Sequence, residues 1–167
     1  MEVRVVKKEE IPQVSQFVEE TMKSVFPFPL SEMSKRDLTD MDSLFLAKEK
    51  ATFIAAFDHD AVVGTIAVRP YDDRIASIKG RYKADDTCEI IKCYVEAKRR
   101  QQGIGSLLFA EAERYCAEVG YRIMYLHTHH FLPGGLFFWK KKGFITVLDE
   151  GGEMETVHLE KRVPVGE

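Results

Sequence analysis

Apolar residues recur at helical spacing in two long stretches of the chain, with short strand-like runs between and after them. From Ile11 to about residue 25 they fall every three or four positions, which predicts an amphipathic helix. The two prolines of FPFPL, residues 26–30, end that helix, because proline cannot donate a backbone hydrogen bond. The serine and the acid of SKRD predict that a second, short helix starts at Ser34. The second long stretch, residues 104–119, predicts a helix that stops at Gly120.

Strand-like runs occupy five segments of the chain, residues 3–6, 51–57, 61–70, 87–95 and 122–128. Residues 135–142 then predict a helix, and FITVLDEGGEMETVHLEKRV predicts a final hairpin. The helix that joins the last two of the five strands makes a right-handed crossover, so those strands run parallel. The sequence therefore predicts an α/β (α+β) fold: a mixed, mostly antiparallel central sheet with two splayed parallel strands and flanking helices.

Composition and charge narrow the class of protein. With 167 residues, 45% of them hydrophobic, the chain suffices for one real core, and we assign residues 1–167 to a single domain. No apolar run approaches the roughly 18 residues of a membrane span, and MEVRVVKKEE lacks a signal-peptide block, so we expect a soluble, cytoplasmic protein. A net charge of −3 opposes general nucleic-acid binding. Three cysteines without a CxxC pair predict reduced thiols.

The most informative motif is RQQGIG, residues 100–105, which lies between a predicted strand and the helix that follows it. Amides in the first turn of a helix have no partner within it, and they carry the positive end of the helix dipole. Gly103 and Gly105 remove the side chains that would keep a phosphate from these amides, and Arg100 adds a positive charge. The alternative is that the two glycines only shape a tight strand-to-helix turn.

Two other phosphate-binding motifs do not fit this stretch. A P-loop needs lysine and then serine or threonine after its last glycine, where this chain has Ser106 and Leu107. A dinucleotide-binding fingerprint needs a third glycine where this chain has Leu108. Neither of these two phosphate-binding motifs is therefore present.

The RxxGxG pattern stands between a strand that ends in YV and an amphipathic helix, with CEIIKCYV before it and FFWKKKGF, residues 137–144, near the end of the chain. In these features the sequence resembles the GNAT superfamily of acyl-CoA-dependent N-acetyltransferases. The resemblance extends over nearly the whole chain and includes the order of its elements. It implies that acetyl-CoA is a co-substrate, that amides from Gln101 to Ser106 hold its pyrophosphate, and that the strand edge near Cys93–Val95 pairs with its pantetheine arm. The residues expected to bind this co-substrate are Cys93, Tyr94, Val95, Arg100, Gln101, Gln102, Gly103, Ile104, Gly105 and Ser106.

Acetyl transfer to an amine needs a proton acceptor, because an alkylamine with a pKa near 10.4 is neutral in only about one molecule in 2,500 at pH 7. The resemblance maps the EIxxxxV arrangement, whose glutamate is the base in some members, onto Glu89 to Val95. The alternative is an ordinary strand-end acid that faces solvent or pairs with Lys92. A backbone amide near Tyr94 or Val95 is the expected donor to the oxyanion.

The histidines of HTHH offer further candidates. Among His127, His129 and His130, the last is the predicted catalytic residue, because it lies beside the mouth of the expected slot and can act as base, acid or hydrogen-bond partner. A metal site is an alternative, but no acidic or cysteine partner has suitable spacing nearby, so we predict no metal.

Two positions depart from the family pattern. Trp139 occupies the place of a tyrosine that donates a proton to the departing thiolate in many members, and an indole is not an acid of that kind. A thiol pKa near 8.5 lets the thiolate leave without full protonation, so transfer does not require this tyrosine. Leu132 stands where an asparagine often precedes the late helix, which removes an expected cofactor contact.

The sequence thus predicts an N-acetyltransferase that moves an acetyl group from acetyl-CoA to a primary amine of a small molecule or protein, by direct attack in a ternary complex. A catalytically weak acyl-CoA-binding sensor is the alternative, suggested by Trp139. The expected partner is the amine substrate, without nucleic acid or membrane, and a homodimer is left open.

Overall fold

A computed structural model describes residues 1–165 of the chain, which divide into two compact units. The N-terminal unit comprises Met1–Arg69 and Ile90–Tyr115, and the C-terminal unit comprises Pro70–Glu89 and residues 116–165. Strand β4 (Thr87–Val95) and helix α3 (Ile104–Val119) each contribute residues to both units, so the chain passes between them within regular structure.

Four strands follow one another in the N-terminal unit. β1 (Glu2–Val5), β2 (Thr52–Asp58) and β3 (Ala61–Pro70) form antiparallel pairs in sequence order, with a bulge in β2 between Ala56 and Phe57. The last part of β4 lies next to β3, since the amide of Glu96 donates to the carbonyl of Val63 at 2.9 Å.

Helices bury one face of these strands in an apolar core. They are η1 (Lys8–Glu10), α1 (Ile11–Val25), α2 (Glu32–Thr39) and a π-helical turn, η2 (Asp42–Leu46). Val14 and Val18 of α1 pack in one cluster with Phe53 of β2 and Ala67 of β3, because the apolar stripe of the helix meets every second residue of the strands. The predicted start of α2 at Ser34 is wrong. Ser31 caps the helix instead, and its hydroxyl accepts from the amide of Ser34.

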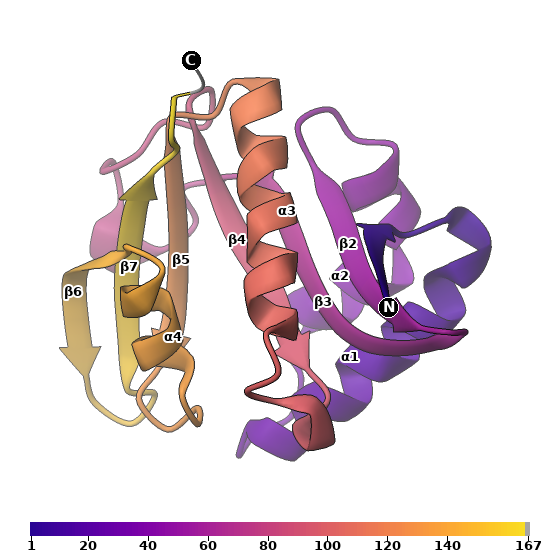
Figure 1. Ribbon diagram of the computed structural model, residues 1–167. Coiled ribbons are helices and arrows are strands. Elements are labelled where there is room, and N and C mark those ends of the chain that lie inside the picture. Colours follow the sequence, from indigo (N-terminus) through magenta and orange to yellow (C-terminus); the bar gives the residue numbers. More distant parts are fainter. Residues whose placement is uncertain (166–167) are drawn as a thin grey trace. The chain divides into compact units, whose positions relative to one another are not determined.

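The C-terminal unit has the strand order β4-β5-β7-β6. Residues Thr87–Glu89 of β4 pair in parallel with Ile123–Tyr125 of β5 (Ile123–His129). β7 (Thr156–Arg162) pairs antiparallel with β5 and with β6 (Ile145–Gly151), and the short helix α4 (Gly135–Lys141) lies against β5 (Figure 1). Its core is aromatic, with the rings of Tyr71, Tyr82 and Tyr125 in mutual contact at centroid distances of 5.3–5.5 Å.

These elements confirm the predicted fold class: a mixed, mostly antiparallel sheet with one parallel pair and flanking helices. The splay of the two parallel strands stays a prediction. All three cysteines are free thiols, as predicted. Among residues 1–165, no helix is both long enough and apolar enough to cross a membrane.

Helix α3 packs against β3 at a glycine. A methyl group at Gly64 would lie 2.9 Å from Cδ1 of Leu108, 3.2 Å from Cγ2 of Ile104 and 3.2 Å from the carbonyl oxygen of Tyr94. Contacts this short are repulsive, so the helix needs the bare backbone of Gly64 in order to approach the strand so closely.

We expect Gly64→Ala to lower the free energy of unfolding by about 1–3 kcal/mol, the usual cost of overpacking. Leu108→Ala should be destabilising on its own, because it opens a cavity in a buried site. If the clash with Leu108 carries the cost, the double variant loses less stability than the sum of the single variants in urea unfolding. Strict additivity would contradict this account of the helix-to-strand contact.

Candidate active site

The turn that leads into α3 is exposed at Gln101, Gln102 and Gly103. Gln101 and Gly103 both have positive φ angles, of 65° and 87°, and a side chain on Gly103 would meet nothing within 4 Å. The amide of Leu107 donates to the carbonyl of Gly103, four residues earlier, as in an α-helix. The amides of residues 104–106 come before this hydrogen bond, in the first turn of the helix, where an amide has no helical partner. The turn therefore presents donors and the positive end of a helix dipole, which together suit an anion.

The basic residues before this turn have different surroundings. Arg99 forms an ion pair with Asp58 at 2.5 Å and a second with Glu96 at 3.1 Å. Arg100 is exposed, and its Nε donates to the carbonyl of Val95 at 3.4 Å. Arg100 also lines a groove of about 440 Å³ with residues of α1, among them Gln13. Of the two arginines, Arg100 is thus the one whose charge is accessible to a ligand.

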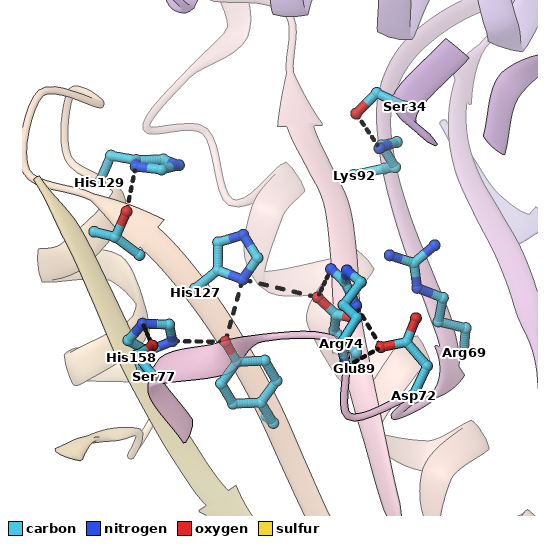
Figure 2. A network of polar contacts seen from close by, with 12 residues as sticks. Ser34, Arg69, Asp72, Arg74, Ser77, Glu89, Lys92, His127, His129 and His158 are labelled. Atoms are coloured by element: carbon cyan, nitrogen blue, oxygen red, sulfur yellow. Dashed lines mark hydrogen bonds and ion pairs between the residues drawn. The ribbon is translucent and has the colours of Figure 1, made fainter. Parts of the chain in front are cut away.

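Strand β4 departs from extended geometry at Lys92, whose φ of 53° is unusual for a residue other than glycine. The carbonyl of Lys92 accepts from the hydroxyl of Thr65 at 2.7 Å. Its ammonium lies 3.3 Å from the hydroxyl of Ser34 (Figure 2) and 3.3 Å from Oδ2 of Asp37. Asp37 also pairs with Arg69, so buried contacts hold the strand in this conformation next to Cys93–Val95, which is predicted to bind the co-substrate.

The cysteines of β4 are poor nucleophiles. Burial raises the pKa of the Cys93 thiol to about 12, and burial together with the neighbouring thiol of Cys116 raises the pKa of the Cys88 thiol well above its usual value. Both thiols therefore stay protonated at neutral pH, and neither supplies the thiolate that a covalent acyl intermediate needs.

Glu89 is fully buried and bound by an arginine from the loop that precedes β4. Its Oε1 and Oε2 accept from Nη1 and Nη2 of Arg74 at 2.7 and 2.9 Å, and the same arginine pairs with Asp72 at 2.9 Å (Figure 2). The alternative of a solvent-facing acid is therefore wrong. Burial of a carboxylate is tolerated here because both of its oxygens take part in charged hydrogen bonds.

His127 lies beside this carboxylate on β5. Its Nδ1 is 3.8 Å from Oε2 of Glu89 and 3.2 Å from the hydroxyl of Tyr125, while Figure 2 shows the other ring nitrogen turned away from these contacts. Burial lowers the pKa of His127 to about 4, although the charge of Glu89 acts in the opposite direction. The imidazole is therefore neutral at physiological pH and has a lone pair for a proton.

A second histidine continues the contacts of Tyr125. The Tyr125 hydroxyl lies 2.7 Å from Nδ1 of His158, a residue of β7 that is 1% exposed. Nε2 of His158 in turn contacts the carboxylate of Glu150, which accepts a further hydrogen bond from Ser77 at 3.2 Å. His127, Tyr125, His158 and Glu150 thus form one continuous series of polar contacts within the C-terminal unit.

The predicted catalytic residue His130 lies after the end of β5. Its Nε2 contacts Oδ2 of Asp149 at 2.8 Å, and both side chains are exposed. His129 is held by the carbonyl of Met154, which lies 2.7 Å from its Nδ1. In the part of the chain that the structure describes, no three His, Cys, Asp or Glu side chains are grouped so that they could hold a metal ion.

Sequence reasoning missed Arg74, Tyr125, His158 and Glu150 as members of this group. The alternation of Tyr125, His127 and His129 along β5 was a usable signal, because residues two apart on a strand face the same side. Trp139, which replaces the usual tyrosine, is buried and packs edge to face on Phe138 and Phe144.

Comparisons with known proteins relate this geometry to a family. The acetyltransferase (GNAT) family model matches residues 16–144. A GNAT-family acetyltransferase from Staphylococcus aureus Mu50 is similar, with a TM-score of 0.77, 16% identity and coverage of 98% of this chain and 99% of that chain. The PaiA N-acetyltransferase from Thermoplasma acidophilum in complex with coenzyme A is also similar, with a TM-score of 0.70, 19% identity and coverage of 96% of this chain and 98% of that chain. An aminoglycoside 6'-N-acetyltransferase complexed with coenzyme A has a TM-score of 0.73 and 16% identity, with coverage of 100% of this chain and 99% of that chain.

No curated protein matches this chain. The solved structures, at such low identity, support the fold alone. The family model covers well over half of the sequence, and it includes the RQQGIG turn and most of the helices and strands described above. On this ground the chain belongs to the GNAT family of acetyltransferases.

Proposed function

We propose that the protein is an N-acetyltransferase that moves an acetyl group from acetyl-CoA to a primary amine of a small molecule or protein. Transfer occurs by direct attack of the amine in a ternary complex. The observation that carries the proposal is the uncovered turn at the start of α3, with positive φ angles at Gln101 and Gly103. Direct attack is favoured over a covalent acyl intermediate because Cys88 and Cys93 stay protonated.

The turn fits a diphosphate. The amides of residues 101–106 donate to its oxygens, the open space at Gly103 lets a phosphate approach the backbone, and Arg100 adds charge from the side. The backbone of Cys93, Tyr94 and Val95 is expected to pair with an amide-bearing arm as a further strand would. When bound, acetyl-CoA supplies the activated thioester, and an amide near Tyr94 or Val95 is the proposed donor to the oxyanion.

Proton removal is assigned to the buried polar group of the C-terminal unit. Both oxygens of Glu89 already accept from Arg74, so we keep Glu89 in the catalytic group as a fixed negative charge that favours a proton on the neighbouring imidazole. His127 is the proposed proton acceptor, because it is neutral and its Nε2 is directed away from its own partners. His130 remains a second candidate, at the exposed end of the same strand.

Two further proposals concern the chain as a whole. We propose that residues 1–167 act as one acetyltransferase domain, since β4 and α3 each contribute to both compact units.

A catalytically weak acyl-CoA sensor is the second candidate function, and the burial of Trp139 in place of an acidic hydroxyl favours it.

Purified protein should release free thiol from acetyl-CoA in the presence of at least one primary amine, at a rate well above the hydrolysis background. A panel that includes polyamines, aminoglycosides and peptides with free amino termini would be assayed with a thiol reagent. Coenzyme A binding without release for any amine of the panel would favour the sensor instead.

Gly103→Ala should weaken coenzyme A binding at least about tenfold, because a methyl group then occupies the space through which a phosphate reaches the amides. Gly120→Ala is the matched control. Its φ of 92° and its open surroundings resemble those of Gly103, so both variants should lose about 1–2 kcal/mol of stability through backbone strain. Titration calorimetry and urea unfolding would measure the two effects. Equal affinity in the two variants would refute the assignment of this turn.

His127 should make the protein less stable in mild acid. The unfolded chain protonates this histidine near pH 6.5, whereas the folded protein does so only near pH 4. Because the unfolded state then binds more protons, the free energy of unfolding falls as pH decreases from about 6.5 to about 4. His127→Gln removes this contribution, so its stability should change less over that interval in urea unfolding. An identical pH dependence in both proteins would show that His127 is not held neutral.

A further inference from the structure

The polar series that begins at His127 passes through the interior of the C-terminal unit, and its two end members are both partly exposed. The side chain of His127 is 30% exposed, that of His158 only 1%, and that of Glu150 38%. Tyr125, whose hydroxyl lies between the two histidines, is completely buried. The series therefore connects a neutral imidazole with an exposed carboxylate through groups that can each donate and accept a proton.

The contacts assign the tautomers along the series. The carboxylate of Glu150 can only accept, so Nε2 of His158 carries its proton and Nδ1 has the lone pair. The Tyr125 hydroxyl then donates to that Nδ1 at 2.7 Å, which leaves its oxygen to accept from Nδ1 of His127 at 3.2 Å. The proton of His127 is thereby placed on Nδ1, and Nε2 is the basic nitrogen.

The hydrogen bonds all have the same direction, which is the condition for concerted proton movement. From this arrangement we infer that His127, Tyr125, His158 and Glu150 form a proton relay that carries the proton of the attacking amine to solvent. This inference rests on the proposed N-acetyltransferase function. It assigns Tyr125, His158 and Glu150 as positioning and relay residues.

The relay conserves protons and moves no electron pair out of the group. Nε2 of His127 takes one proton from the nitrogen as the carbon–nitrogen bond forms. The Nδ1 proton of His127 passes to the oxygen of Tyr125, the hydroxyl proton passes to Nδ1 of His158, and the Nε2 proton of His158 passes to Glu150. Glu150 then releases one proton to water. After the product leaves, one proton from water enters at Glu150 and the three transfers run in reverse, while Nε2 of His127 releases its proton to water in the emptied site; this restores the starting tautomers of His127 and His158.

The charges around His127 make such a relay useful. Burial and the nearby His129, Arg74 and His158 disfavour a lasting charge on His127, and only Glu89 favours it. An imidazolium at this position would therefore be a high-energy intermediate. If the Nδ1 proton of His127 passes to Tyr125 while Nε2 receives the proton of the amine, the ring stays neutral. The hydrogen bond from His158 holds the pKa of Glu150 below its usual value, so this carboxyl loses its proton readily at neutral pH.

The kinetic test uses Tyr125→Phe and Glu150→Gln. Each should lower kcat at least about tenfold and leave the KM for acetyl-CoA within about twofold of the wild-type value. A small tertiary-amine buffer, which forms no stable amide, should restore kcat of Glu150→Gln as its concentration rises at fixed pH. Tyr82→Phe is the matched control for Tyr125→Phe, because Tyr82 packs in the same aromatic cluster but donates to Glu160. Glu153→Gln controls for the loss of an exposed acid from the same hairpin.

Nitrogen NMR of labelled histidines adds a readout that does not depend on turnover. The relay requires the Nδ1–H tautomer of His127 and the Nε2–H tautomer of His158 in the wild-type protein, and an Nε2–H form of His127 in the wild type overturns it. Amine-dependent thiol release by the wild type, combined with unchanged kcat and no buffer dependence in both variants, overturns the relay alone. Absence of any amine-dependent release overturns the N-acetyltransferase proposal and the catalytic use of the relay with it.

Discussion

The buried ion pair between Glu89 and Arg74 is the interaction on which the candidate chemistry depends. A carboxylate without solvent exposure costs several kcal/mol unless its oxygens are satisfied, and here two short charged hydrogen bonds satisfy them. The pair ties the loop that carries Asp72 and Arg74 to the first part of β4. It also fixes a permanent negative charge 3.8 Å from the ring of His127, where a mobile or solvated acid would have a much weaker influence.

Two opposed effects act on His127, the proposed proton acceptor. Desolvation prevents it from being charged in advance, so the lone pair is available at every physiological pH. The same desolvation makes the ring a poor place for a proton to remain, and Glu89 offsets only part of that cost. In the proposed mechanism, the contact between Nδ1 of His127 and the hydroxyl of Tyr125 is therefore as important for proton removal as the basic Nε2. A histidine of ordinary pKa would not need such a neighbour, but half of its population would be protonated near pH 6.5.

Sequence patterns predicted the parts of the molecule that are formed by residues close to one another in the sequence. The helix of α3, its bare glycines and the flanking strand are close in sequence, so periodicity and the RxxGxG spacing predicted that turn with its amides. The partner of Glu89 was not predictable in this way. Arg74 comes from an irregular loop with no periodic pattern, and Lys92, a neighbour on the same strand, was the plausible alternative. His158 and Glu150 join the group only through the pairing of β5 with β7 and of β7 with β6.

The two ways in which this protein deals with negative charge suit two different tasks. In the proposed function a cofactor has to leave after each turnover, and backbone amides at an exposed helix terminus are suited to bind a diphosphate without burying a countercharge that would lose its partner on release. The carboxylate of Glu89 never leaves, so a buried arginine can hold it permanently and rigidly, and its field requires no reorganisation when charge develops nearby. The proposal therefore places glycine where a bound anion has to leave, whereas arginine contacts the negative charge that belongs to the protein itself. A sequence motif indicated the proposed anion site, whereas the ion pair of Glu89 with Arg74 became apparent only from the three-dimensional contacts.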